Sequence, residues 1–399
     1  MSLQGLISYL AILKPWLQGK GPLIFSVCIT DLLIALLIMK KLVLFIHQGL
    51  RAVKYSTAIV LFLLLQSCEK RPGDINQYAS FNITERRKAE TISLDTAVFR
   101  YPFRVSVKKD KAWIMDLHNP DNYYHAFSYP GFRYLGSFGH KGQAAGEMLS
   151  AETFRYQQAD FVWTLDANKA QLVRWSSDDG WMNARQKETI NLEQGIIRAL
   201  DFIIYNDSTF IIPDYSGKNR LCWVNRQGKI VKRSGRIPSE KQYSEGARIP
   251  LAQAWRSFMD YNPRNGILAL ATQLGEVLEV YDLRNDTTIV VKGPLGDPEF
   301  SGTEGFAIPT GSMGFSDVRV TDRHIYAVFH GRSFKEIARM GNKSRVDGGQ
   351  YIYVYNLKGE PICKYVLDRF IYGIYVDEDK GIITAVDVNS DQPVCRISL

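Results

Sequence analysis

The sequence predicts an all-β domain, a six-bladed β-propeller of four-stranded antiparallel blades over residues 89–399, preceded by an N-terminal hydrophobic leader. Beyond residue 88, short β-branched and aromatic runs recur between Gly, Asn and Asp turns, while long helical periodicity is scarce. The same turn-and-strand hairpin appears six times. Apolar residues make up 46% of the chain, enough for a large core. A lone blade cannot bury both faces, so six such units are expected to pack in a ring.

Residues 1–67 are predicted to be a leader or signal peptide. An apolar run from Thr57 to Leu65 follows the basic residues Arg51 and Lys54 and ends just before Cys68. A basic region, a short apolar region and a small residue before the cleavage point are typical of a secretory signal. The run is too short to span a bilayer comfortably.

A second apolar run, residues 22–39, lies further upstream and is interrupted by Asp31. It is either the product of a start codon placed too early or an additional transmembrane helix. Residues 68–88 are polar and rich in turn formers at their start, and they are predicted to be a lipid-attached linker.

The repeat is defined by turns that precede apolar strands. These turns lie at residues 107–110, 156–160, 206–207, 262–266, 321–322 and 377–381. Their spacing fits the roughly 40–50 residues of a four-stranded blade, with modest loop insertions.

The chain ends inside a strand, residues 394–399, which leaves no room for a fourth strand in the last blade. We therefore expect residues 91–98 to supply that outer strand. Such pairing would close the ring and protect its edges.

Several segments resemble the TolB-like six-bladed propeller lipoproteins of Gram-negative bacteria, which look related to NHL-repeat propellers. The resemblance is carried by the glycine-rich connector at residues 136–147 and by residues 351–359 and 374–378. A Pro commonly precedes the last glycine of this connector, where Ala145 stands here. The segment ending at Cys68 resembles a lipobox, with Gln66 as an unusual residue. The resemblance implies a diacylglycerol on Cys68 and a propeller fold, but no chemistry.

Common catalytic signatures are absent from the sequence: no Gly-x-Ser-x-Gly elbow, zinc helix, phosphate loop or dinucleotide fingerprint occurs. No cofactor or metal is therefore expected. The alternative is a metal-dependent, lactonase-like hydrolase or lyase with its site in the central channel. Its candidate ligands would be His118, His125, His140, His324 and His330, with acids such as Asp116 or Asp387.

Two loops are candidate ligand sites. Residues 331–350 form a long basic insertion that suits an acidic glycan, a phosphate or an acidic protein surface, unless it is a solvated flap. Residues 176–183 place Trp181 beside acids, as in many sugar sites, unless the ring packs over a blade edge. The candidate ligand-binding residues are His330, Arg332, Lys335, Arg339 and Trp181.

The charge balance and the cysteine spacing argue against further classes of function and site. The chain has 49 basic and 41 acidic residues. Six of the basic residues and one of the acidic residues precede Cys68, so the remainder has 43 basic and 40 acidic residues and a net charge of +3. This balance argues against a nucleic-acid partner. Cys222, Cys363 and Cys395 show no zinc spacing or disulfide framework; a Cys363–Cys395 bond and buried free thiols both remain open.

The combined hypothesis is a lipid-anchored lipoprotein of the cell envelope, expected at the periplasmic or surface face of the outer membrane. It would act as a non-catalytic module that binds a protein or glycan partner.

Overall fold

A computed structural model describes residues 74–95, 99–158, 161–177, 180–303, 305–340 and 346–399. The predicted leader, residues 22–39 and Cys68 lie outside these ranges. Within them, no helix has the length and apolarity needed to cross a membrane.

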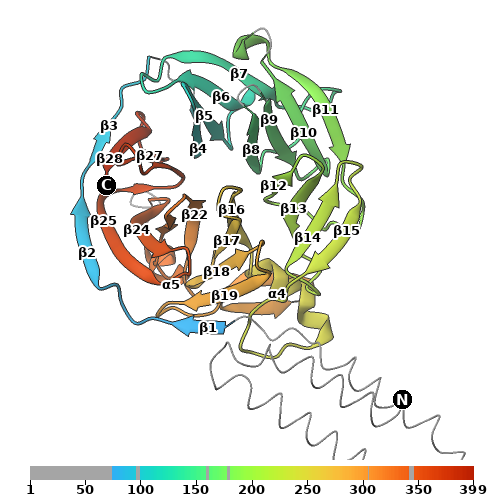
Figure 1. Ribbon diagram of the computed structural model, residues 1–399, viewed down its shortest axis with the longest axis vertical. Coiled ribbons are helices and arrows are strands. Elements are labelled where there is room, and N and C mark those ends of the chain that lie inside the picture. The colour runs from blue at the N-terminus through green and yellow to red at the C-terminus, as the bar shows by residue number, and fades with distance from the viewer. Residues whose placement is uncertain (1–73, 96–98, 159–160, 178–179, 304, 341–345) are drawn as a thin grey trace, which may run out of the picture. The chain divides into compact units, whose positions relative to one another are not determined.

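The described residues form six blades arranged in a ring, which confirms the predicted propeller (Figure 1). Blade 1 contains β4 (Pro102–Lys108), β5 (Lys111–Asp116), β6 (Asn122–Ser128) and β7 (Tyr134–His140). Blade 2 contains β8 (Thr153–Gln158), β9 (Phe161–Asp166), β10 (Gln171–Ser176) and β11 (Arg185–Asn191). Blade 3 contains β12 (Ile203–Asn206), β13 (Thr209–Pro213), β14 (Leu221–Asn225) and β15 (Ile230–Ser234).

The other three blades follow the same antiparallel order. Blade 4 contains β16 (Ser257–Asn262), β17 (Ile267–Thr272), β18 (Val277–Asp282) and β19 (Thr287–Lys292). Blade 5 contains β22 (Phe315–Val320), β23 (His324–Phe329), β24 (Gly349–Asn356) and β25 (Pro361–Ile371). Blade 6 contains β26 (Ile374–Asp377), β27 (Ile382–Val386), β28 (Val394–Ser398) and β3 (Ala89–Thr91).

All six predicted hairpins join the first and second strands of a blade. In blade 4, for example, Asn262 pairs with Ile267, and the side chain of Asn262 accepts a hydrogen bond from the Arg264 amide at 2.9 Å. Such Asx turns favour a tight reversal. Because strands alternate in direction, these six turns lie on one face of the ring, here called the hairpin face.

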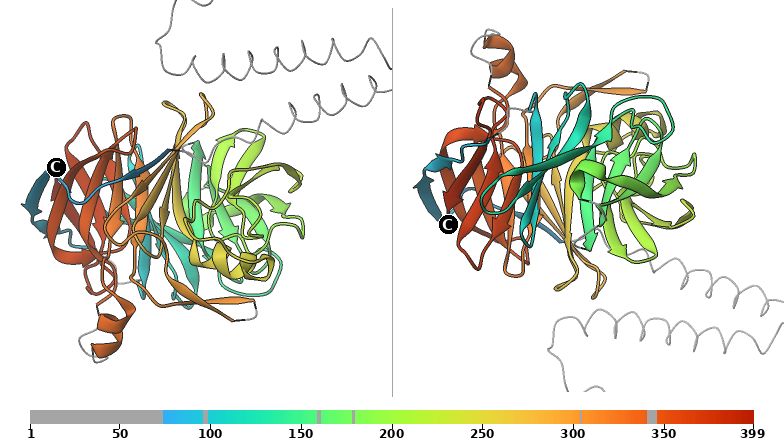
Figure 2. Two further views of the ribbon diagram at one scale, coloured as in Figure 1. Left: turned by 90° about the horizontal axis from the view of Figure 1, so that it is seen from below. Right: turned by 90° about the horizontal axis from the view of Figure 1, so that it is seen from above.

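The opposite face, called the helix face, carries the longer connections (Figure 2). They contain η4 (Glu245–Ala247), α4 (Arg248–Ala254), the two-stranded sheet of β20 (Phe300–Thr303) and β21 (Phe306–Pro309), and α5 (Phe334–Arg339). A short 3-10 helix, η3 (Trp181–Asn183), follows β10.

The predicted linker is wrong from Asp74 onward. Residues 74–91, here called the strap, run around the outside of three blades. Strand β1 (Asp74–Gln77) pairs in parallel with β19, and β2 (Ile83–Arg87) pairs in parallel with β25. The outer strand of a blade exposes unpaired amides and carbonyls, and the strap satisfies them. A polar sequence does not prevent this, because the pairing groups belong to the backbone.

The ring is closed by the N-terminal segment, as expected, but with an earlier strand. Strand β3 pairs antiparallel with β28, placing Ala89 opposite Ile397 and Thr91 opposite Cys395. The predicted strand at residues 91–98 therefore starts too late, and residues 96–98 lie outside the described part. Leu94 is buried against blade 1 and blade 6 instead of continuing the sheet.

Two aromatic side chains fix the strap between blades 4 and 5. The Tyr78 hydroxyl donates to Glu276 at 2.8 Å and lies 2.9 Å from the Tyr355 hydroxyl. The ring of Phe81 packs 4.5 Å from that of Tyr353. Burial raises the pKa of Tyr78, so its hydroxyl stays protonated and able to donate.

Replacing Tyr78 by Phe should lower the free energy of unfolding by about 1–2 kcal/mol, because the Glu276 carboxylate loses a buried donor. Denaturant unfolding of the full chain measures this. Tyr243→Phe is the matched control, since the Tyr243 ring stacks on Phe300 and its hydroxyl has no partner among the described residues. Equal losses in the two variants would contradict a fixing role for Tyr78.

Candidate functional site

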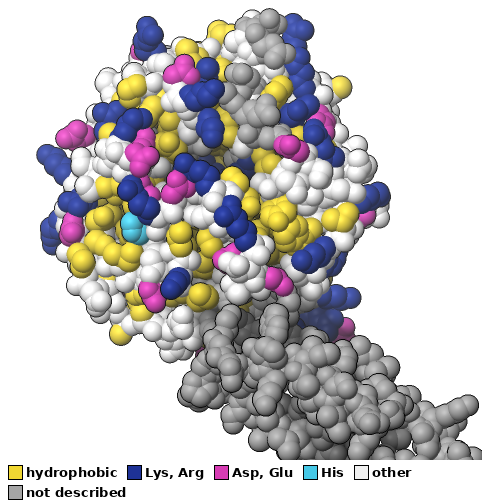
Figure 3. Space-filling view, viewed as in Figure 1, with side chains coloured by type: hydrophobic (Ala, Val, Ile, Leu, Met, Phe, Trp, Pro, Cys, Tyr) yellow, Lys and Arg dark blue, Asp and Glu magenta, His cyan; other side chains and the backbone are white. Residues whose placement is uncertain are grey.

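The hairpin face is hollowed at its centre into a funnel of about 880 Å³. Its wall is built from the inner strands of all six blades and from the turns that follow them. Figure 3 shows this face, where basic and acidic side chains both gather around the centre. Every blade of the ring therefore contributes to this concave surface.

The rim of the funnel carries charges of both signs and several phenol rings. Arg264 lies 2.7 Å from Asp322, and Arg323 lies 3.1 Å from Glu378. The Arg264–Asp322 pair is exposed and contributes little to stability, whereas the Glu378 side chain is only 8% exposed. The rings of Tyr205, Tyr261 and Tyr375 also line the wall.

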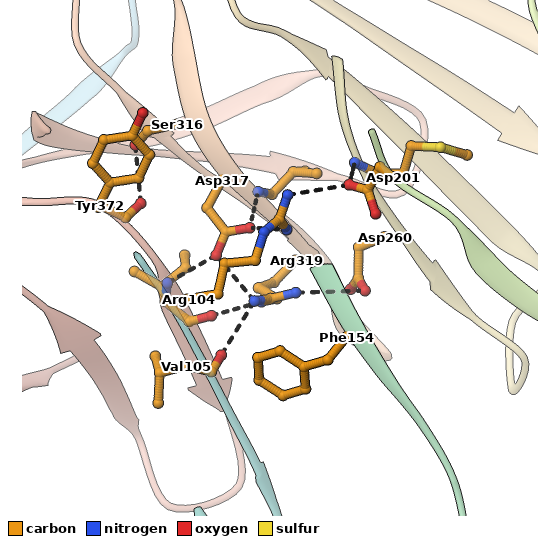
Figure 4. Close-up of polar contacts among 12 residues, drawn as sticks. Arg104, Val105, Phe154, Asp201, Asp260, Ser316, Asp317, Arg319 and Tyr372 are labelled. Atoms are coloured by element: carbon orange, nitrogen blue, oxygen red, sulfur yellow. Dashed lines mark hydrogen bonds and ion pairs between the residues drawn. The ribbon is translucent and has the colours of Figure 1, made fainter. Parts of the chain in front are cut away.

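The floor of the funnel is an ionic cluster on the ring axis (Figure 4). Arg104 of β4 crosses the channel and contacts Asp201 at 3.2 Å and Asp317 at 3.4 Å. All three side chains are at most 2% exposed. Their blades, numbers 1, 3 and 5, alternate around the ring.

Arg155 joins three successive blades on one side of the cluster. From β8 in blade 2, its guanidinium donates to the Phe202 carbonyl at 2.8 Å and to the Met259 carbonyl at 2.6 Å. It also forms a 2.7 Å ion pair with Asp201.

Arg319 repeats this arrangement on the other side. From β22 in blade 5, it donates to the Ile374 carbonyl in blade 6 at 2.6 Å and to the Val105 carbonyl in blade 1 at 3.2 Å. Its ion pair with Asp317 is 3.0 Å long. Together the two arginines tie six inner strands through backbone carbonyls.

The carboxylates complete the cluster by accepting hydrogen bonds from backbone amides of the following blade. Asp201 accepts from Met259 at 3.0 Å, Asp260 from Val320 at 2.8 Å, and Asp317 from Ile374 at 2.9 Å. Each carboxylate also contacts an arginine. The cluster is thus a belt of inter-blade bonds around the axis.

This arrangement leaves the floor poorly suited to acid–base or metal chemistry. Burial raises the pKa of Asp260, while Arg319 and Arg155 lower it. The described residues contain no group of three or more His, Cys, Asp or Glu side chains placed to hold a metal ion.

The structure scatters the five histidines of the hydrolase hypothesis. His125 is buried in β6 with Nδ1 2.7 Å from Ser137, and burial lowers its pKa to about 4. His324 pairs with Glu378 at 2.7 Å near the funnel rim. The other three lie apart in blades 1 and 5: His118 packs on Tyr101, His140 approaches Glu147 and His330 bonds Arg332.

The candidate acids Asp116 and Asp387 belong instead to a repeated structural motif. Asp116 ends β5, and its side chain accepts hydrogen bonds from the backbone amides of Tyr101 at 2.7 Å and His118 at 3.1 Å. Asp387 follows β27 and accepts the Asn389 amide at 2.9 Å. Asp166 and Asp214 occupy matching places in blades 2 and 3. These aspartates cap the turn after the second strand, so turn geometry accounts for them.

The predicted ligand-binding residues are not brought together. His330 and Arg332 bond each other at 2.9 Å, and Arg332 also donates to the Val346 carbonyl at 2.8 Å. Burial and Arg332 lower the pKa of His330 to about 4, so it is neutral at pH 7. Lys335 and Arg339 are exposed on α5, on the helix face and away from the funnel.

Trp181 is not an aromatic platform, which corrects that hypothesis. Its side chain is 2% exposed and packs 5.4 Å from Trp113 and 4.9 Å from Phe138. Gly136 permits this packing, because a Cβ there would lie 2.5 Å from the Trp181 backbone. Trp181 therefore packs over the edge of blade 1. Cys222, Cys363 and Cys395 are free and buried.

The ionic cluster was not predicted from the sequence, although the sequence carries a signal for it. Single charged residues interrupt apolar inner strands at Arg104, Arg155 and Arg319, each between apolar or aromatic neighbours. A charge inside a buried strand needs a partner. Searching the other repeats for acids at the equivalent strand would have identified Asp201, Asp260 and Asp317.

Asp317→Asn should destabilise the protein by about 3–5 kcal/mol, because Arg104 and Arg319 lose their shared buried counter-charge. Asp322→Asn makes the same chemical change in an exposed pair and should cost at most about 1 kcal/mol. Thermal and denaturant unfolding of both variants checks this. Similar losses of unfolding free energy in the two variants would show that the belt does not hold the ring together.

Comparisons with known proteins agree with the fold. The family model described as TolB-like 6-blade propeller-like matches residues 80–379. A member of the DUF4221 family from Bacteroides vulgatus is similar, with a TM-score of 0.53 and 11% identity over 79% of this chain and 96% of that chain. A protein of Bacteroides fragilis named as exported has a TM-score of 0.50 and 8% identity over 81% and 98% of the two chains. No curated protein matches the sequence.

Proposed function

Because the chain belongs to the TolB-like 6-blade propeller-like family, we propose that it is a non-catalytic binding module of the bacterial cell envelope. A lipid on Cys68 holds it to a membrane, and the funnel on the hairpin face binds a protein partner. The funnel is the observation that carries this proposal. It is open and lined by all six blades, and the charges at its floor already serve inter-blade bonds.

The chemistry of the rim favours a protein segment over a glycan. Full charges of both signs, such as Lys108, Arg264 and Asp322, stand beside phenol rings that offer an apolar surface with a polar tip. A peptide with mixed charges and an apolar anchor complements such a rim. A glycan partner remains the second candidate, since Tyr205 and Tyr261 can stack on sugar rings.

Two observations support an envelope location. The leader pattern before Cys68 is typical of secretion, and a structure with the same fold is named as exported. The hydrolase or lyase alternative has less support, because the carboxylates of the channel are engaged by arginines and backbone amides.

Photo-crosslinking tests the funnel. A benzophenone amino acid at Lys108, an exposed position on the funnel wall, should give an adduct with a protein in membranes of the native host. Lys218 is the matched control, because it is also exposed but lies in the turn between β13 and β14 on the helix face. Mass spectrometry identifies the adduct.

A glycan adduct at Lys108 would select the second candidate. Adducts at Lys218 but not at Lys108 would contradict binding in the funnel.

The lipid anchor is tested by Cys68→Ala. Each methylene of a buried acyl chain contributes about 0.8 kcal/mol to membrane binding, so loss of the lipid should move the protein to the soluble fraction. Cell fractionation and the intact mass of the N-terminal fragment measure this. Retention of the variant in the membrane fraction would point to residues 22–39 as the anchor instead.

A further inference from the structure

Strand β1 fixes the direction in which the chain before the strap leaves the ring. It pairs in parallel with β19, with Asp74 opposite Ile289 and Gln77 opposite Lys292. Strand β19 runs from the hairpin face to the helix face, because it is the outer strand of blade 4 and precedes the connection to blade 5. The chain before Asp74 is therefore directed toward the hairpin face, on which the funnel opens.

The stretch from Cys68 to Asp74 is too short to turn back and reach the other face. Cys68 stands six residues before Asp74 (74 − 68). A reversal uses about four residues in a turn, and the remaining two would span about 7 Å. The helix-face end of β19 at Lys292 is three residues along the strand from Ile289 (292 − 289), or about 10 Å. A lipid on Cys68 therefore stays nearer the hairpin face of blade 4.

The hairpin face lacks the side chains of a surface that enters a bilayer. Met182 is the one exposed large apolar side chain in the described turns of this face. The connections on the helix face carry six such residues: Leu149, Ile197, Ile249, Leu295, Phe306 and Ile308. Charges at the funnel rim include the pairs Arg264–Asp322 and Arg323–Glu378. Because bilayers bind apolar side chains and clusters of free cations, this face suits a polar partner beside the membrane better than the lipid itself.

We propose that the funnel opens toward the membrane and that its partner is the polar segment of an integral membrane protein that emerges from the same bilayer. This inference rests on the lipid anchor and the funnel of the proposed function. A short tether keeps the funnel near the bilayer surface and raises the effective concentration of a partner held there. A soluble protein does not benefit from this effect, so the anchor selects the class of partner.

Energy transfer tests the orientation in the full-length lipidated protein. A donor dye on Asn285→Cys reports on the hairpin-face end of β19, and the same dye on Leu295→Cys is the matched control at the helix-face end. Both side chains are exposed, and the three thiols in the described part of the chain are buried. The strand between the probes has six residues, or about 20 Å. In vesicles of phosphatidylethanolamine and phosphatidylglycerol with an acceptor on the headgroup, the Asn285 probe should transfer more energy than the Leu295 probe.

Lengthening the tether separates the orientation from the anchor. About ten Gly and Ser residues inserted before Asp74 remove the length limit, so the difference between the two probes should shrink while the protein stays on the vesicles. With the natural tether, a Leu295 probe that transfers as much energy as the Asn285 probe, or more, would overturn the orientation and leave the anchor intact. Protein that floats free of the vesicles would overturn the anchor and this inference together.

The class of partner is identified in membranes of the native host. The adduct formed by the benzophenone at Lys108 should be an integral membrane protein, and its yield should fall in the variant with the longer tether. An adduct with a soluble protein would overturn this class of partner and leave binding in the funnel intact. An adduct with lipid would show that the bilayer itself occupies the funnel, which would also overturn the inference.

Discussion

The ring depends on the buried arginine–aspartate belt around its axis. A propeller brings six inner strands together at one axis, where their polar side chains have little access to water and an unpaired charge is costly. Arg104 meets this constraint by contacting aspartates of two other blades, and Arg155 and Arg319 by reaching the carbonyls of the two following blades. Because each charged side chain of the belt already lies against a group of opposite charge, the belt contributes to the shape of the ring more than to chemistry.

The outside of the ring is held by different forces. The strap adds backbone pairs to blades 4 and 5 and then supplies the last strand of blade 6. Tyr78 and Phe81 connect this pairing to the core between two blades. The ring is thus closed by sequence-distant contacts both at its axis and at its edge. The closing strand, β3, is the last strand of the strap.

Sequence reasoning could find the features that repeat locally. Turn residues before apolar strands located all six hairpins, because Asn and Asp determine tight turns through their own side chains. The strap was missed because Asp-Ile-Asn-Gln pairs through its backbone and buries no periodic face. The sequence left two positions open for Trp181, an exposed platform and a packed blade edge, because its burial depends on Gly136, forty-five residues away (181 − 136). The partners of Arg104 lie in two other blades, which no local pattern reveals.

The two faces of the ring differ in the length of their connections. On the hairpin face, short Asx turns leave the funnel open and its rim charges accessible. On the helix face, long insertions carry α4, α5 and the β20–β21 hairpin, and they place apolar and basic groups outward. Insertions are tolerated on this face because they extend from loops and leave the inner strands and their belt unchanged. The two faces of this propeller can therefore vary independently, provided that the axis keeps its paired charges.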